Sequence, residues 1–198
     1  LRINNKPLAC ITFDDGHISY MKYAFPIMKK LNIKSTVYLI SDVYLRKSQP
    51  NEWWIYLWEY SQKTINLNFI FLKKYFAFSL RDNLISKYFR EVFFRALCYS
   101  YERSSLKEQY KIDKYIKYYQ KDSLKNYINK NNISRIEKES LVRFGSHSKT
   151  HRHLSKLSNS ELKKEIINSK NDLEKNLAIK IKDFCYPYGR NSDIGRNA

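Results

Sequence analysis

The N-terminal part of the chain alternates between two apolar runs and a segment of helical periodicity, which limits the folds available to it. Leu8–Phe13 and Ser35–Ile40 are apolar and partly β-branched, which predicts two buried strands. The apolar residues that recur at helical spacing between them are Ile18, Met21, Phe25, Met28 and Leu31. Pro26 predicts a kink or a restart within this helix. A strand, a helix and a strand within about 35 residues predict a βαβ unit with parallel strands and a right-handed crossover.

The same pattern returns in the C-terminal part of the chain. Leu141–Gly145 predicts one strand, and Lys182–Tyr186 predicts another. Between them, Ser158 and Glu161 have the spacing of a capping box. The apolar face of the helix that follows is formed by Leu162, Ile166, Leu173 and Leu177. The sequence therefore predicts the α/β fold class.

The middle of the chain differs from both ends. Residues 45–140 interleave aromatic and charged side chains and contain no glycine and a single proline, Pro50. Trp53–Trp58 and Tyr88–Phe94 predict amphipathic helices. The aromatic side chains could stack on sugars or bases, but packing in a helical core is the simpler interpretation. We predict that residues 1–44 and 141–198 form two parts of one catalytic domain and that residues 45–140 are a helical insertion.

Net charge and apolar content set limits on partners and location. The 198 residues carry 37 Lys and Arg against 19 Asp and Glu, a formal charge of +18, which favours anionic partners such as nucleic acid, anionic lipid or acidic glycan. This charge is spread along the chain, so a solvated basic surface is favoured over a binding stripe. No run of about 18 apolar residues predicts a membrane span. The oligomeric state is left open.

The cysteines and the N-terminal residues of the chain are relevant to the cellular compartment of the protein. Cys10, Cys98 and Cys185 are odd in number and far apart, which predicts reduced core thiols and neither a disulfide framework nor a metal cluster. The chain as given reads as cytoplasmic. An extracytoplasmic or cell-surface location follows if an N-terminal signal precedes Leu1.

Glycine and histidine, four of each, concentrate in three short stretches that follow the predicted strands. These stretches are Thr12–Gly16, Ser146–His151 and Phe184–Gly189. The residues that lie within or beside them are Gly16, Gly145 and Gly189, together with His17, His147, His151 and His153. A glycine in a chain that otherwise avoids it predicts positive φ or a close approach of the backbone. Ligands of α/β proteins gather at the carboxyl ends of parallel strands.

The three stretches supply the groups of a mononuclear metal hydrolase. A catalytic zinc ion takes three protein ligands and keeps one open position, and one aspartate with two histidines meets that number. A second carboxylate beside them can act as general base. Asp-Asp-Gly alone is most often a turn, and His-x3-His alone is more often a helix surface. Residues 148–150 lack the glutamate of the His-Glu-x-x-His proteases, which excludes that metalloprotease motif.

The combination resembles a known family. Thr12–Gly16 matches the first motif, Thr-Phe-Asp-Asp-Gly, of the polysaccharide deacetylases of carbohydrate esterase family four, which share the homology domain of nodulation chitooligosaccharide deacetylases. His147–His151 resembles the second motif, and Phe184–Gly189 resembles the third. The resemblance implies a distorted, incomplete (β/α) barrel with its site at the carboxyl ends of the strands.

The resemblance also implies a role for individual residues. Asp14 would be the general base. The ligands of one divalent ion, with Zn²⁺ expected, would be Asp15, His147 and His151. The backbone N–H of Tyr188 would help to hold the oxyanion, and Pro187 and Tyr188 would contact the substrate.

Two departures from the family affect these expectations. Cys185 stands where the third motif has arginine, and Tyr186 stands where it has proline. The fourth motif and the Leu-x-His that supplies the general acid are not found after Gly189, so we expect the chain to be a fragment with slow turnover. His17 and His153 are expected to be loop or supporting residues and not replacements for the acid.

The sequence therefore favours a metal-dependent de-N-acetylase acting on an N-acetylated polysaccharide or oligosaccharide of a bacterial surface. The alternative within the same family is a catalytically impaired, glycan-binding fragment. A more distant alternative is a nucleic-acid-binding protein, supported by charge alone. Metal content distinguishes the first two from the third, and acetate release distinguishes the first from the second.

Overall fold

The computed structural model describes residues 2–3, 6–48, 53–63, 87–116, 124–136, 140–190 and 193–194. The chain divides into two compact units, one formed by residues 1–51 and 122–198 and the other by residues 52–121. The second unit contains α3 (Trp53–Lys63), α4 (Lys87–Arg103) and α5 (Leu106–Ile116). The helices predicted at 53–58 and 88–94 are confirmed. This unit is shorter at both ends than the predicted insertion of residues 45–140.

A small parallel sheet organises the first unit. Its strands are β3 (Thr12–Phe13), β4 (Ser35–Leu39) and β5 (Val142–Ser146), in the order β3-β4-β5. Both neighbouring pairs are parallel, so the predicted pairing of the first two strands is confirmed. The strand predicted at residues 182–186 is reduced to one parallel bridge between Phe184 and Ser146. A short antiparallel pair, β1 (Arg2–Ile3) and β2 (Lys6–Pro7), precedes the sheet.

The buried strand predicted at Leu8–Phe13 is wrong over most of its length. Regular pairing is confined to β3, and Leu8, Cys10 and Ile11 are exposed. Within the described residues β3 pairs only with β4, so an apolar run at this edge is not covered as it would be between two strands. Cys10 is therefore not a core thiol. All three cysteines are free, and Cys98 and Cys185 are half-buried.

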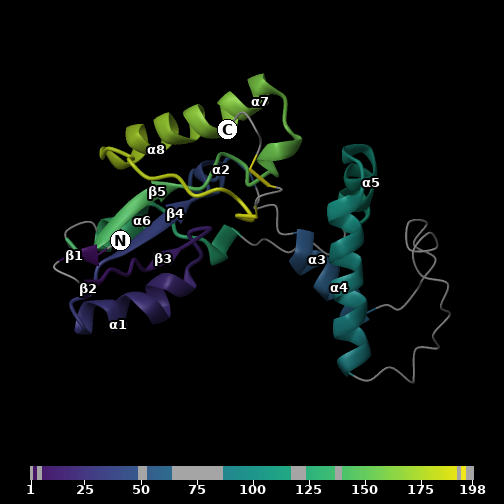
Figure 1. The fold of residues 1–198 in the computed structure, drawn as a ribbon, viewed down its shortest axis with the longest axis horizontal. Helices are drawn as coiled ribbons and strands as arrows, with labels where there is room; N and C mark the ends of the chain where they lie inside the picture. Colours follow the sequence, from purple (N-terminus) through teal and green to yellow (C-terminus); the bar gives the residue numbers. More distant parts are fainter. Residues whose placement is uncertain are drawn as a thin grey trace. The chain divides into compact units, whose positions relative to one another are not determined.

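The helices of the first unit pack around this sheet, which lies between α1 and α8 in Figure 1. After β3 come the π-helical turn η1 (Tyr20–Ala24) and α1 (Phe25–Lys30), with Pro26 in the first turn of α1. The remaining elements in chain order are α2 (Ser41–Tyr44), η5 (Leu124–Asn126), α6 (Lys130–Ile136), η6 (Leu154–Lys156), α7 (Asn159–Lys163), η7 (Lys164–Asn168) and α8 (Ser169–Leu177). The predicted capping box of Ser158 and Glu161 begins α7.

One apolar core holds the sheet and these helices together. Val37 and Leu39 of β4 and Phe144 of β5 are buried in it with Leu173 and Leu177 of α8. Three further members lie on or beside α6, namely Ile128, Ile133 and Ile136. Residues 124–136 therefore pack with the sheet, although they fall inside the sequence range predicted as an insertion.

Gly16 is fixed both by backbone conformation and by lack of space, which gives a stability prediction. Its φ is +68°, and a Cβ there would lie 2.6 Å from Cδ2 of Leu39, a fully buried side chain. Gly189 has a similar φ of +67°, but no described atom lies within 4 Å of its Cβ position. Gly16→Ala should lower the free energy of unfolding by about 2–4 kcal/mol through backbone strain plus overpacking, whereas Gly189→Ala should cost about 1–2 kcal/mol through strain alone. Urea unfolding of the metal-free chain measures both, and equal losses would contradict the role assigned to Leu39.

Candidate metal centre and active site

The parallel register brings two distant segments to the same edge of the sheet. β3 ends at Phe13, so Asp14 and Asp15 follow directly at its carboxyl end. β5 ends at Ser146, which pairs with Leu39, and the His147 N–H donates to the Leu39 carbonyl at 2.9 Å. Because the carboxyl ends of parallel strands share one edge, the acidic and the histidine segments meet there.

Three side chains converge at this edge. Ligand atoms of Asp15, His147 and His151 all lie within 4.8 Å of one another. Oδ1 of Asp15 is 3.4 Å from Nε2 of His147 and 3.2 Å from Nε2 of His151. The two imidazoles are 2% and 5% exposed, whereas the aspartate side chain is 31% exposed. The structure thus brings together the three residues predicted as metal ligands, with one side of the cluster open.

The donor set and one buried atom fit a divalent cation. Oδ1 of Asp15 is buried and accepts no hydrogen bond of ordinary geometry from any residue that the structure describes. A buried carboxylate oxygen left in that state is costly. One carboxylate oxygen and two imidazole nitrogens are the ligands of many catalytic zinc sites. A cation between the three residues would therefore give Oδ1 of Asp15 a partner of opposite charge and would use both facing imidazole nitrogens.

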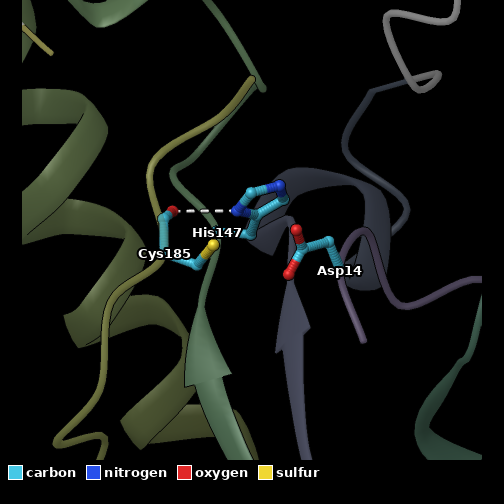
Figure 2. A group of neighbouring side chains, drawn as sticks. All are labelled: Asp14, His147 and Cys185. Atoms are coloured by element: carbon cyan, nitrogen blue, oxygen red, sulfur yellow. Dashed lines mark hydrogen bonds between the residues drawn. The ribbon is translucent and has the colours of Figure 1, made fainter. Parts of the chain in front are cut away.

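A hydrogen bond to the backbone sets the tautomer of His147. Its Nδ1 lies 2.8 Å from the carbonyl oxygen of Cys185, as the dashed line in Figure 2 shows. A carbonyl accepts and does not donate, so Nδ1 must carry the proton. The lone pair of the neutral ring then resides on Nε2, the atom that faces Asp15. The backbone of the third stretch thereby presents His147 in the form that a metal ion requires.

In the metal-free cluster, attraction between the Asp15 carboxylate and the two histidines shifts the pKa values of Asp15 and His147 more than burial does. Burial raises the pKa of the Asp15 carboxyl, but its interactions with His147 and His151 outweigh burial and hold that pKa well below its usual range. Burial lowers the pKa of His147, but Asp15 and the Cys185 carbonyl outweigh burial and raise that pKa to about 10. Attraction to Asp15 therefore favours the protonated His147 ring in the metal-free chain, and a cation that takes these ligands has to displace that proton.

Left-handed backbone is concentrated in the loops that form the site. Asp15, Ser148, His151 and Tyr188 have φ values of 67°, 64°, 58° and 66°. Such conformations cost free energy in residues other than glycine and are found preferentially at functional sites. The segment between the two histidines is accordingly a loop and not the helix face that His-x3-His spacing often indicates. Its turn is closed by the His151 N–H, which donates to Oγ of Ser148 at 3.0 Å.

Asp14 lies on the other side of His147 from the third stretch. Figure 2 shows the His147 ring between Cys185 and Asp14. Possible ligand atoms of these three residues also lie within 4.8 Å of one another. Asp14 is exposed to solvent, whereas Asp15 is partly buried. The two adjacent carboxylates therefore occupy different environments, and Cys185, expected to be a core thiol, reaches the site.

The remaining residues predicted for the site surround this cluster. The Tyr188 ring stacks on His153, with centroids 3.7 Å apart and planes at 9°, and its centroid is 4.9 Å from that of His151. The Tyr188 hydroxyl donates to the His151 carbonyl at 3.4 Å. Pro187, predicted to contact substrate, is buried.

The other two histidines interact with side chains outside the ligand set. Nδ1 of His153 lies 3.1 Å from Oδ1 of Asp193. His17 is exposed and its Nδ1 lies 2.8 Å from Oγ of Ser19. These contacts agree with the expectation that both histidines are loop or supporting residues.

The side chains that support the loop between His147 and His151, called the histidine loop below, were not predicted from the sequence. Glu165, Ser169 and Asp42 hold the backbone or side chains of residues 148–150. Glu165 and Ser169 lie on helical segments rich in Lys, Glu, Asn and Ser, where no local pattern marks them out. Among the residues that support the two histidines, Cys185 could have been found from the sequence, because it lies within the third stretch.

A cavity of about 450 Å³ lies at the amino ends of the strands, opposite the carboxyl ends that carry the candidate metal centre. It is lined by residues at the amino ends of β4 and β5, including Ser35, Thr36, Leu141 and Val142. No residue of the candidate centre lines it.

No helix in the described part of the chain combines the length and the apolar character needed to cross a membrane.

Comparisons with known proteins agree with a hydrolytic metal centre, because both matches are to deacetylases. Residues 102–198 match the family model described as polysaccharide deacetylase. The structure of the Streptococcus pyogenes deacetylase PplD in complex with acetate resembles this chain with a TM-score of 0.51 at 16% identity, over 96% of this chain and 53% of that one. This chain thus spans about half the length of that deacetylase, and the likeness shows a shared fold. No curated protein sequence matches significantly. The family match over residues 102–198 and the shared fold together support a polysaccharide deacetylase domain in this chain.

Proposed function

We propose that this domain is a metal-dependent de-N-acetylase that hydrolyses the acetamide of an N-acetylated sugar to an amine and acetate. The observation that carries the proposal is the convergence of Asp15, His147 and His151, with Asp14 beside them, at the carboxyl ends of the parallel strands. The family match supports the reaction class. The related Streptococcus pyogenes deacetylase was solved with acetate, the acid that such a reaction releases.

Asp15, His147 and His151 would hold one divalent ion, and Zn²⁺ suits their donor atoms. When bound, such an ion supplies Lewis acidity, which lowers the pKa of water and polarises a carbonyl. The protein's own contribution is to orient the ligands. The Cys185 carbonyl fixes the His147 tautomer, and the Ser148 side chain closes the turn that presents His151.

Asp14 is suited to take the proton of the attacking water. It is the carboxylate of the pair that is exposed to solvent, so water and substrate can reach it. Asp15 is the carboxylate that faces the two imidazoles. We therefore assign Asp14 as general base and Asp15 as ligand, a division that adjacent residues achieve because Asp15 has left-handed backbone.

Tyr188 is assigned to the developing oxyanion through its backbone N–H. The Tyr188 ring contacts the rings of both His151 and His153, and these contacts fix the position of the Tyr188 backbone N–H. Departure of the amine requires a proton, and we assign no described residue to supply it. Pro187 and Tyr188 are assigned to contact the substrate, and Pro187 is the buried residue of the two.

The wider assignments follow the family. The sheet of β3, β4 and β5 would be one part of a distorted, incomplete (β/α) barrel that carries residues 52–121 as a helical insertion. The substrate would be an N-acetylated polysaccharide or oligosaccharide of a bacterial surface.

Acetate release from an N-acetylglucosamine oligomer tests the proposal. The Zn²⁺-loaded chain should release acetate, and removal of the ion by a chelator should stop the release until Zn²⁺ is restored. Zinc binding without acetate release from any N-acetylated oligomer would favour the glycan-binding alternative. Failure to bind zinc would contradict the proposal itself.

A further inference from the structure

One buried carboxylate outside the three sequence stretches holds the loop between the two imidazoles. Glu165 lies on η7 and is 5% exposed. Its Oε2 accepts hydrogen bonds from the backbone N–H groups of Lys149 and Thr150, both at 2.9 Å. Its Oε1 accepts a third from the Thr150 hydroxyl. A single side chain thus takes three donors from the two residues that precede His151.

The carbonyl groups of the same loop are held by other elements. The N–H groups of Ser41 and Asp42 on α2 donate to the carbonyls of Ser148 and Lys149, at 3.2 and 3.1 Å. The Ser169 hydroxyl on α8 donates to the Ser148 carbonyl at 2.9 Å. Glu165 satisfies the N–H side of the loop, and α2 and α8 satisfy the C=O side. All these bonds act on the backbone or hydroxyl groups of residues 148–150 and not on the imidazoles.

These restraints matter because the loop is strained. Ser148 and His151 both have left-handed φ, a conformation that persists only when surrounding contacts impose it. Hydrogen bonds from N–H to an ionised carboxylate are stronger than those to a neutral acceptor. Without the carboxylate, the two N–H donors would lose their acceptor and the turn would be free to relax.

We propose that Glu165 is a positioning residue for the candidate metal centre. By holding the backbone of Lys149 and Thr150, it aims Nε2 of His151 at the Asp15 carboxylate. The inference rests on the proposed function, because it treats His151 as a ligand. It deepens that function by assigning control of ligand geometry to a helix outside the three stretches. A residue of this kind should affect metal affinity beyond any effect on folding.

The test compares two glutamates that make the same kinds of bond. Glu165→Gln removes the charge and places an amide against N–H donors. Glu108→Gln is the matched control, because Glu108 accepts from the N–H and the hydroxyl of Ser105 at the start of α5, in the second unit. The readouts are the dissociation constant for Zn²⁺, by competition with a chromophoric chelator, and the urea midpoint of the metal-free chain. Glu165→Gln should weaken Zn²⁺ binding by about 10- to 100-fold, as expected for a residue that orients a ligand, and Glu108→Gln should leave it unchanged.

Each outcome decides between a positioning and a purely structural role. A lower urea midpoint with unchanged Zn²⁺ affinity in Glu165→Gln would overturn the inference. If that variant does not fold, Thr150→Val decides, because it removes only the hydroxyl bond to Glu165. A folded Thr150→Val with smaller but measurable weakening of Zn²⁺ binding supports the inference, and unchanged binding overturns it.

A His151→Ala arm separates this inference from the function on which it rests. If His151→Ala binds Zn²⁺ as tightly as the unaltered chain, the proposed metal centre is wrong. If His151→Ala loses Zn²⁺ while Glu165→Gln and Thr150→Val retain the original affinity, the metal centre stands and only the role of Glu165 fails.

Discussion

Asp14→Asn should abolish acetate release and leave zinc binding intact. The amide has nearly the shape of the carboxylate but cannot accept the proton of the attacking water. General base catalysis of this kind is typically worth about 10² to 10⁴ in rate, so release should fall by that factor. The measurement is acetate release from an N-acetylglucosamine oligomer by the Zn²⁺-loaded protein, with the zinc content determined on the same sample.

Asp113→Asn is the matched control, because it makes the same change of charge on α5 in the second unit. It should leave both acetate release and zinc content unchanged. Loss of zinc in Asp14→Asn would show that the roles assigned to the two carboxylates are reversed. Retention of full acetate release would remove Asp14 from the reaction.

His151→Ala should lose most of the bound zinc, the second large effect. It removes one of three ligands, so we expect a greater loss of affinity than the roughly 100-fold seen when a residue behind a ligand is changed. His17→Ala is the control, because His17 is exposed and its ring nitrogen interacts with Ser19 and not with the cluster. Zinc affinity by chelator competition separates the two variants, and equal affinities would contradict the ligand assignment.

The convergence of the ligands was open to prediction because it depends on strand order and direction. Asp15 and His147 each follow a run that reads as a strand, and parallel strands place their carboxyl ends together. The special backbone environment of Gly16 could also be predicted, because the chain has only four glycines. Its φ is positive and Leu39 lies close to it. The roles of these residues remain predictions until metal and activity are measured.

What the sequence did not predict depends on contacts between distant segments. The apolar run before β3 was expected to be buried, but Cys10 and Ile11 are exposed because burial depends on a neighbour beyond the edge strand. Residues 124–136 were predicted as part of the insertion because their composition resembles it, yet Ile133 and Ile136 belong to the core of the sheet. Glu165 carries no local signal, since its bonds to the histidine loop exist only after η7 has packed there.

Among the residues that the structure describes, two overlapping sets could hold an ion at this edge of the sheet. Both contain His147, one with Asp15 and His151 and the other with Asp14 and Cys185. The second set would use a thiolate, and it would leave Asp14 unable to act as base. The hydrogen bond from Nδ1 of His147 to the Cys185 carbonyl leaves Nε2 as the ligand atom, and Nε2 is the atom that faces Asp15 of the first set.

X-ray absorption at the zinc edge of the Zn²⁺-loaded chain distinguishes the two sets and tests the central claim most directly. Binding by Asp15, His147 and His151 predicts a first shell of nitrogen and oxygen at about 2.0–2.2 Å, with the outer scattering of two imidazoles and no sulfur. A sulfur scatterer at about 2.3 Å would place the ion on Cys185 and contradict the account.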